Sequence, residues 1–292
     1  LAGSRSRRSA GKKIREGRRR MADTKNKTAL AKKLGVSRAS LYYRPKKPKE
    51  DSVIKEKILV LRGEHPAYGH RRMALHLGLN RKRIARIMKK FGIRPKIMRG
   101  KPWKPGDVGK PATAIPNLAK TLCPIKANVL WAGDFTYIPW RGEFIYVATV
   151  IDVYTREIVG WHIGMRHTTD LVIQAFLDAI SRASKASQIF HSDQGSEYVS
   201  GEYELLLANL DVRASQSKKS SPWENGFQES FYNQFKLELG KPSRFTDLGE
   251  LVEAIHAQML YYNQRRIHSA LKMPPAAFRI RHENKTTAIV AV

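Results

Sequence analysis

Residues 131–164 have the sequence WAGDFTYIPWRGEFIYVATVIDVYTREIVGWHIG, and this stretch decides the fold. Its apolar, aromatic and β-branched runs are separated by short turns, which predicts three strands, at 131–138, 144–153 and 155–164. An amphipathic helix is predicted over 169–184, and QIFHSD (188–193) predicts a short buried strand that ends in charge. The sequence therefore predicts an α/β domain, a mixed sheet flanked by helices.

Two carboxylates lie at informative places in this sheet. Asp134 lies inside the first predicted strand, and Asp193 ends the strand at 188–193, where HSDQG leaves the sheet. Open α/β sheets place their sites at the carboxyl ends of strands, and hard divalent cations require oxygen ligands. Polynucleotide chemistry commonly uses two such cations, held by converging carboxylates. These two residues are therefore candidate metal ligands.

A third candidate, Glu229, lies on the predicted helix SPWENGFQESFYNQFK (221–236). Ser221 is a good N-cap, Pro222 suits the first helical position, and Glu224 completes a capping box, so Glu224 is assigned to the helix start. The i+4 spacing of the phenylalanines predicts a buried stripe, which comprises Phe227, Phe231 and Phe235. A separate polar face suits a metal-and-phosphate site, with Asn225, Glu229, Asn233 and Lys236.

Asp152 and His191 compete with these candidates. Asp152 also lies near a strand end, but the DVYTRE sequence (152–157) favours a hydrogen-bonding role in the turn that follows. For His191 we favour a packing or supporting role over that of a general base. Neither residue is included in the predicted site.

Charge is distributed unevenly along the chain. The 292 residues include 54 Lys and Arg against 25 Asp and Glu, a formal net charge of +29, and residues 1–110 hold 35 of the basic and 7 of the acidic residues. A basic N-terminal third before a nearly neutral remainder is the pattern of a polyanion-binding arm on a globular domain. Nucleic acid is the expected partner.

Residues 28–43, TALAKKLGVSRASLYY, predict a helix, a turn and a second helix. Gly35 suits the turn, and Ser37 is positioned to cap the second helix, which presents Arg38 and Ser40 outward. In basic surroundings this pattern favours a DNA-binding helix-turn-helix over an ordinary helical hairpin.

A second helical unit follows the spacer RPKKPKE (44–50). Helices are predicted at 52–63 and 70–77, and a third extends from a cap at Asn80 to Gly92. Its apolar residues Ile84, Ile87, Met88 and Phe91 follow the spacing of a buried stripe. The rest of this helix favours a phosphate-facing surface because it carries six basic residues and no acidic one: Arg81, Lys82, Arg83, Arg86, Lys89 and Lys90.

Composition excludes several classes of protein. A single cysteine, Cys123, forms no intramolecular disulfide and builds no Cys-rich zinc site. No apolar run approaches the length of a membrane span, and no signal peptide is evident, so a cytoplasmic protein without membrane partners is expected. The predicted organisation is a basic disordered tail (1–24), a helix-turn-helix (25–48), a second helical DNA-binding unit (51–94), a linker (95–119), a catalytic core (120–280) and a tail (281–292).

Four ordered motifs give the sequence a resemblance to a known family. They are WAGDFTYI (131–138), HSDQGSEY (191–198), SPWENGFQESF (221–231) and YNQRRIHSAL (262–271), followed by Pro275 and Phe278. With 35 residues between Asp193 and Glu229, the chain resembles bacterial insertion-sequence transposases with a retroviral-integrase-like core. The resemblance covers roughly residues 52–279, and Gly133 stands where many members carry a polar residue.

The resemblance implies an RNase H-like core in which Asp134, Asp193 and Glu229 bind two Mg²⁺ (or Mn²⁺) ions. It further implies cleavage at the ends of a mobile element, direct strand transfer by the freed 3′-hydroxyl, and a homo-oligomer that holds terminal repeats and target DNA. Arg265, Arg266 and His268 are expected either to contact DNA or to brace the core.

Two other interpretations remain open. The first is a non-catalytic DNA-binding protein, such as a repressor or an inactive element copy. The second is a recombinase with a covalent tyrosine intermediate that uses Tyr262, Arg265 and His268, which leaves the carboxylates without a role.

Overall fold

A computed structural model describes the chain at residue 16 and over 19–20, 26–42, 47–96, 115–217 and 225–290. The chain divides into two compact units, Leu1–Lys57 and Ile58–Val292. Most of the predicted basic tail, most of the predicted linker and the capping-box residues Ser221, Pro222 and Glu224 lie outside the described residues.

The first unit contains the predicted helix-turn-helix elements. Helix α2 (Lys27–Leu34) ends at Gly35 in the left-handed conformation (φ 64°), and α3 (Arg38–Tyr42) follows. The Ser40 backbone N–H donates to the Ser37 hydroxyl at 3.2 Å, which confirms the predicted cap. Helix α4 (Lys47–Glu64) begins inside the predicted spacer 44–50, which is therefore shorter than expected. A proline near the first helical position and an acidic residue in the first turn are both compatible with this earlier start.

Two further helices, α5 (His70–Leu77) and α6 (Arg81–Lys90), follow at the predicted positions. The Asn80 side chain caps α6 by accepting from the Lys82 N–H at 2.8 Å, and Ile84, Ile87 and Met88 are buried as predicted. The prediction for Phe91 is wrong, since its side chain is 36% exposed. The helix ends at Lys90, so Phe91 no longer continues the buried stripe.

Hydrogen bonds join the loop between α4 and α5 to residues 261–267 near the C-terminal end of the chain. The Ile267 N–H donates to the Tyr68 hydroxyl at 2.6 Å, and His65 Nδ1 lies 2.7 Å from the Tyr261 hydroxyl. The His65 ring stacks on Tyr68 at 4.3 Å, and burial lowers the pKa of His65 to about 4, so it is neutral at physiological pH. Residues 58–96 and the sheet therefore form one unit.

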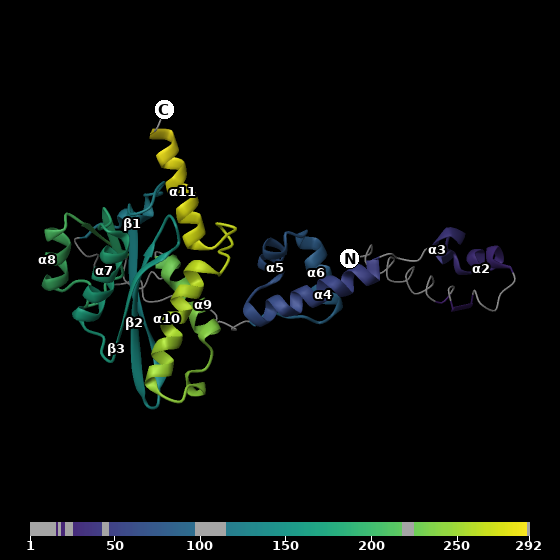
Figure 1. Ribbon diagram of the computed structural model, residues 1–292, viewed down its shortest axis with the longest axis horizontal. Helices are drawn as coiled ribbons and strands as arrows, with labels where there is room; N and C mark the ends of the chain where they lie inside the picture. The colour runs from purple at the N-terminus through teal and green to yellow at the C-terminus, as the bar shows by residue number, and fades with distance from the viewer. Residues whose placement is uncertain are drawn as a thin grey trace, which may run out of the picture. The chain divides into compact units, whose positions relative to one another are not determined.

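The sheet has five strands in the order β3-β2-β1-β4-β5 (Figure 1). Strands β1 (Leu130–Trp140), β2 (Glu143–Asp152) and β3 (Ile158–Gly164) are antiparallel. Strands β4 (Ile189–Ser192) and β5 (Arg213–Gln216) pair in parallel, and β4 also pairs in parallel with β1. The predicted mixed sheet is confirmed, although β5 was not predicted because the sequence RASQ lacks an apolar pattern.

Helices cover both faces of this sheet (Figure 1). On one face, α7 (Thr169–Ala183) and α8 (Gly201–Asn209) bury a cluster that includes Phe176, Phe190 and Tyr203. On the other, α9 (Gly226–Leu239) and α10 (Leu248–Gln264) bury Phe235 and Ile255 against β1 and β2. Helix α11 (Pro275–Val290) extends through most of the predicted tail.

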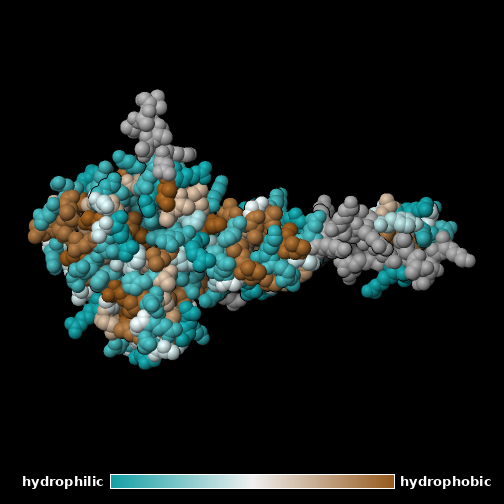
Figure 2. Space-filling view, viewed as in Figure 1, coloured by the Kyte–Doolittle hydropathy of each residue, from teal (hydrophilic) through white to brown (hydrophobic). Residues whose placement is uncertain are grey.

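Hydrophilic residues dominate the visible surface, with apolar patches between them (Figure 2). No helix in the described ranges is long and apolar enough to cross a membrane.

Close packing between β3 and α7 depends on Gly160. A Cβ atom at this position would lie 2.4 Å from both the Ala175 carbonyl oxygen and the Ala179 nitrogen. Because these are backbone atoms of a packed helix, Gly160→Ala is expected to lower the free energy of unfolding by about 3 kcal/mol. Urea unfolding followed by circular dichroism measures the change.

Gly201→Ala is the matched control, since a Cβ there meets nothing within 4 Å. A Gly160→Ala protein as stable as this control would contradict the close approach of β3 and α7.

Candidate active site

Strand register brings Asp134 and Asp193 together. Strands β1 and β4 pair in parallel through Leu130 with Ile189, Trp131 with Phe190 and Ala132 with His191. Extending this register by two residues places Asp134 opposite Asp193, directly beyond the end of β4. Neighbouring strands lie about 4.8 Å apart, so this extended register puts the two aspartates side by side where β4 ends.

Burial and neighbouring negative charges raise the pKa of both carboxyls in this pair. Burial, followed by the negative charge of Asp193, raises the pKa of Asp134 from 3.8 to about 7. The Phe135 N–H, which donates to Asp134 Oδ1 at 2.8 Å, and the ammonium of Lys236 act in the opposite direction. Burial also raises the pKa of Asp193, against a hydrogen bond from the Gly195 N–H at 3.0 Å. Two partly desolvated carboxylates favour a cation between them.

A further acidic residue, Glu197, lies beside this pair and was not predicted. Its side chain is buried, and it is bonded to His167 Nδ1 at 2.8 Å and to the Ser196 hydroxyl at 3.1 Å. Burial alone would raise the pKa of Glu197, but these hydrogen bonds hold it below its ordinary value. A Cβ atom at Gly195 would lie 3.0 Å from Asp193 Oδ1 and 3.2 Å from Glu197 Oε2, so a residue without a side chain is favoured between the carboxylates. The motif HSDQGSEY (191–198) contains both acidic residues and the glycine between them, which is the sequence signal that could have identified Glu197.

A polar stripe anchors α9 to β1 at the level of Asp134. Gln228 Nε2 donates to the Ala132 carbonyl at 2.6 Å and to the Thr149 carbonyl at 3.0 Å. The Tyr232 hydroxyl donates to the Asp134 carbonyl at 2.6 Å, and Asn225 Nδ2 donates to the Gly133 carbonyl at 3.3 Å. Asn225 is 7% exposed, so the expectation that it contacts DNA is wrong in this structure: its amide faces the backbone of β1.

The third candidate, Glu229, is exposed on α9, one residue after the buried Gln228. Within the described residues, no three His, Cys, Asp or Glu side chains are grouped so as to hold a metal ion. The structure thus joins Asp134 with Asp193 but does not bring Glu229 into a common ligand group with them. Lys236, nearly two turns further along α9, lies with Nζ 5.0 Å from the centre of the Tyr137 ring and lowers the pKa of Asp134.

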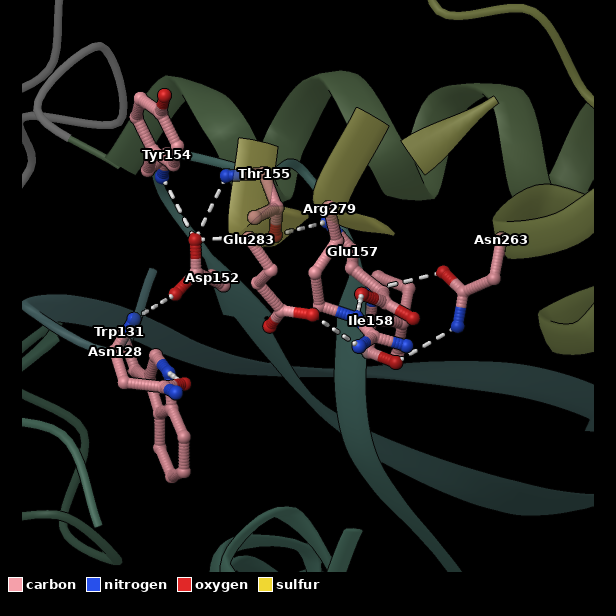
Figure 3. Close-up of polar contacts among 10 residues, drawn as sticks. All are labelled: Asn128, Trp131, Asp152, Tyr154, Thr155, Glu157, Ile158, Asn263, Arg279 and Glu283. Atoms are coloured by element: carbon pink, nitrogen blue, oxygen red, sulfur yellow. Dashed lines mark hydrogen bonds and ion pairs between the residues drawn. The ribbon is translucent and has the colours of Figure 1, made fainter. Parts of the chain in front are cut away.

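Asp152 has the structural role that the turn sequence favours (Figure 3). Its Oδ2 accepts from the Asn128 N–H at 2.7 Å, and its Oδ1 accepts from the N–H groups of Tyr154 and Thr155 at 2.9 and 2.7 Å. The side chain is 1% exposed, so its oxygens are committed to the turn. His191 is also buried, with Nδ1 2.9 Å from the Ser215 hydroxyl.

The YNQRRIHSAL segment contributes one brace and one exposed cation. Arg266 is 2% exposed and bonded to Glu238 and Gln234, both at 2.9 Å, so it braces the core, the second of its two expected roles. Arg265 is exposed and forms an ion pair with Glu64 at 3.1 Å. Burial, followed by three neighbouring arginines, lowers the pKa of His268 to about 4, so His268 is neutral near pH 7.

The predicted DNA-facing residues of the helical segments are mostly exposed. Five of the six basic residues of α6 are exposed and Arg83 is half-buried, while Arg38 is exposed on α3. The hydroxyls of Ser37 and Ser40 lie 2.7 Å apart, so both are engaged in the helix start.

Comparisons with known proteins identify the family of this chain. Two family models described as "Integrase core domain" match residues 124–222 and 210–275. The transposase for insertion sequence element IS904 of Lactococcus lactis is 34% identical over 241 residues, covering 79% of this chain and 95% of that protein. The insertion element IS600 uncharacterized 31 kDa protein of Shigella sonnei is 33% identical, covering 84% and 95%.

Solved integrase structures align less closely. The HTLV-2 integrase catalytic core domain in complex with magnesium has a TM-score of 0.45 and 18% identity over 53% of this chain and 98% of that one. A simian T-cell lymphotropic virus intasome chain has a TM-score of 0.48 and 17% identity over 73% and 70%.

The sheet topology, the paired carboxylates and the matching family models define a protein with an integrase core domain. More narrowly, the chain belongs to the insertion-sequence transposases that carry this core.

Ionisation of Asp134 is expected to make stability depend on pH. Because the pKa of the native carboxyl is about 7, above its ordinary 3.8, the native state keeps a proton that the unfolded state releases between these values. Stability attributable to this group therefore falls as pH rises from 4 to 7. In EDTA, Asp134→Asn is expected to gain about 2 kcal/mol at pH 8 relative to wild type, and much less at pH 5.

Urea unfolding at the two pH values measures this difference. Asp211→Asn is the control, because Asp211 is exposed and its left-handed conformation (φ 53°) suits asparagine. An equal change for Asp134→Asn at pH 5 and pH 8 would contradict the raised pKa.

Proposed function

We propose that this protein is a DNA transposase that cleaves a strand at each end of a mobile element and transfers the freed end to target DNA. The observation that carries the proposal is the closeness of Asp134 and Asp193 just past the last paired residues of β1 and β4, with the pKa of both carboxyls raised. Membership in the insertion-sequence transposases supports the same reaction.

The donors at the site fit a hard divalent cation. Asp134 and Asp193 supply carboxylate oxygens in a partly buried position, and such ligands suit Mg²⁺ or Mn²⁺. We propose that Glu229 completes the ligand set and that two ions are held there. When bound, the ions supply Lewis acidity at the scissile phosphate.

The chain's own residues orient the reacting groups. The hydrogen bonds of Gln228 and Tyr232 fix α9, which carries Glu229 and Lys236, against the strand that carries Asp134. Lys236 favours a negatively charged phosphate near Asp134. In the first step water attacks the phosphorus and the 3′-oxygen leaves; in the second that 3′-hydroxyl attacks another phosphodiester, and one P–O bond forms as one breaks.

DNA recognition is assigned to the helical segments. The basic face of α6 would contact phosphates, which supplies affinity without sequence preference, and the α2–α3 pair would read the terminal repeats. Joining two ends of an element requires two active sites, so we expect a homo-oligomer on DNA. We expect the protein in the cytoplasm because bacterial DNA is accessible there.

The covalent tyrosine mechanism is disfavoured by burial. Tyr262 is 5% exposed and packs against Phe231, with ring centres 4.9 Å apart, so its hydroxyl is poorly placed to attack a phosphate. A non-catalytic DNA-binding protein remains the second candidate, and it would need no carboxylate pair with a raised pKa.

Removing one carboxylate should separate catalysis from binding. Asp193→Asn and Glu229→Gln are each expected to lower metal-dependent nicking of a labelled duplex carrying the element's terminal repeat by at least about 10³-fold, with DNA affinity changed less than about threefold. Gel electrophoresis of the products in Mg²⁺ and in EDTA measures nicking, and fluorescence anisotropy measures affinity.

Glu204→Gln is the control, since Glu204 is an exposed glutamate on α8. Retained nicking in Asp193→Asn would remove that residue from the site. Binding without any nicking by the wild-type protein would favour the non-catalytic candidate, and a trapped covalent protein–DNA adduct would restore the tyrosine mechanism.

The basic face of α6 predicts a salt-dependent contribution to DNA binding. Reversing two charges, in the double variant Arg83→Glu and Arg86→Glu, is expected to weaken binding at least about tenfold and to reduce the slope of log K against log salt by about 2. Anisotropy titrations from 50 to 200 mM salt give both values.

The double variant Lys185→Glu and Arg213→Glu is the control for net charge, because both residues are exposed and lie outside α6. Equal slopes for the two double variants would show that α6 does not face phosphate.

A further inference from the structure

A cavity of about 550 Å³ lies between α5, the β2–β3 turn, α9 and the segment after α10. Its lining includes Arg72 from α5, Arg156 from the turn, and Arg266 and His268 from the segment after α10. Three arginines and a neutral histidine from three distant parts of the sequence therefore meet here, and no Asp or Glu is among the lining residues that the structure describes.

Protein carboxylates balance only part of the positive charge around this cavity, where Glu238 pairs with Arg266 and Asp152 lies near Arg156. Arg266 is paired with Glu238 at 2.9 Å, whereas Arg72 Nε donates to the neutral Ser269 hydroxyl at 3.3 Å. The guanidinium of Arg156 stacks over the Phe227 ring at 3.9 Å. Burial, followed by the charge of Arg266, lowers the pKa of Arg72, as expected where cations face one another. An anion in the cavity would relieve this repulsion.

Two buried nitrogens around the cavity have no hydrogen-bond partner among the residues that the structure describes. They are Nη1 of Arg156 and Nδ1 of His268. An unsatisfied buried donor costs about 1–3 kcal/mol, and more when it is charged, so such groups point to a missing acceptor. Since His268 is neutral, its Nδ1 can carry a proton and donate.

The surrounding backbone holds Arg156 in place. Its N–H donates to the Asp152 carbonyl at 2.8 Å, and its φ of 64° belongs to the turn that the Asp152 side chain fixes (Figure 3). The turn thus fixes the backbone position from which the Arg156 side chain reaches the cavity.

Helix α9 adds a favourable electrostatic field. Gly226, Ser230 and Gln234 line the cavity along one stripe of the helix, beginning at its N-terminus. The N-terminal N–H groups and the helix dipole favour an anion there. Glu229 precedes Ser230 on the same helix, so a strand held in this cavity would pass beside the proposed catalytic residue.

We propose that this cavity binds a phosphodiester group of the DNA strand that extends to the carboxylate site, with Arg72, Arg156 and His268 as its donors. Planar guanidinium groups match two oxygens of a phosphate at once, which neither a lone lysine nor a neutral side chain achieves. The inference rests on the proposed transposase function for the identity of the strand, while the anion pocket itself stands on the local geometry.

The test is a scan of neutral methylphosphonate links along the terminal-repeat duplex, read by anisotropy in EDTA so that no cleavage occurs. Wild-type protein is expected to lose about tenfold in affinity at one link, and Arg156→Gln is expected to bind the unmodified duplex about tenfold more weakly but to show no further loss at that link. The salt slope of Arg156→Gln should fall by about 1, and Arg156→Lys should recover part of the affinity.

Arg182→Gln is the matched control. Arg182 also stacks at 3.9 Å over an aromatic ring, that of Trp161, but its charge is compensated by Asp178 at 2.8 Å. The same methylphosphonate profile in wild type, Arg156→Gln and Arg182→Gln would overturn the proposal. A second result would also overturn it: inorganic phosphate stabilises wild type but not Arg156→Gln, and no methylphosphonate link gives an Arg156-dependent loss of affinity. The pocket would then hold a free phosphate and not a DNA strand.

The readout separates this inference from the proposed function. An Arg156-dependent link in a protein that never nicks DNA would support the pocket and refute the transposase reaction. Nicking that depends on Asp193, with no methylphosphonate link whose effect depends on Arg156, would support the transposase reaction and refute the pocket.

Discussion

The parallel pairing of β1 with β4 is the constraint on which the rest of the structure depends. One register, with Ala132 opposite His191, places Asp134 opposite Asp193 at the point where pairing ends. A slip by one residue would turn one carboxylate to the other face of the sheet. Close packing supports this register, because a Cβ at Gly133 would lie 2.3 Å from the Phe190 ring. Packing against β4 therefore explains the glycine at position 133.

The same constraint explains why α9 is polar on its buried side. Near the end of β4, three successive carbonyls of β1 accept hydrogen bonds from Gln228, Asn225 and Tyr232, which are spaced by three and four residues on the helix. The stripe couples the helix to β1 beside the carboxylate pair. Tyr232 also belongs to the apolar cluster on this face of the sheet, together with Phe231 and Phe235.

Sequence predicted the elements with strong periodicity and missed those whose identity depends on neighbours. The first four strands, α7 and the helical segments follow from apolar spacing, whereas β5 has no such pattern and forms only because β4 is beside it. Spacing placed Phe227 in the core, but its ring is 41% exposed beneath Arg156. Asn225 was assigned to the surface because helical periodicity defines faces but not what covers them. Asp193 was predicted from its place at a strand end and Asp134 from its place inside a strand, while Glu197 required the loop geometry around Gly195.

A carboxylate pair and a group of arginines adjoin different stripes of α9. The carboxylate pair lies along the stripe of Gln228 and Tyr232, and the arginine cavity lies along that of Gly226 and Ser230. Each arrangement is costly in the protein alone, because like charges share a partly desolvated space. A phosphodiester strand with divalent cations carries both of the missing charges, and it would neutralise the two sites together. If both proposals hold, α9 sets the distance between the phosphate anchored in the cavity and the phosphate that reacts. The fold would then select the cleaved bond through this distance, in addition to sequence recognition by the helical segments.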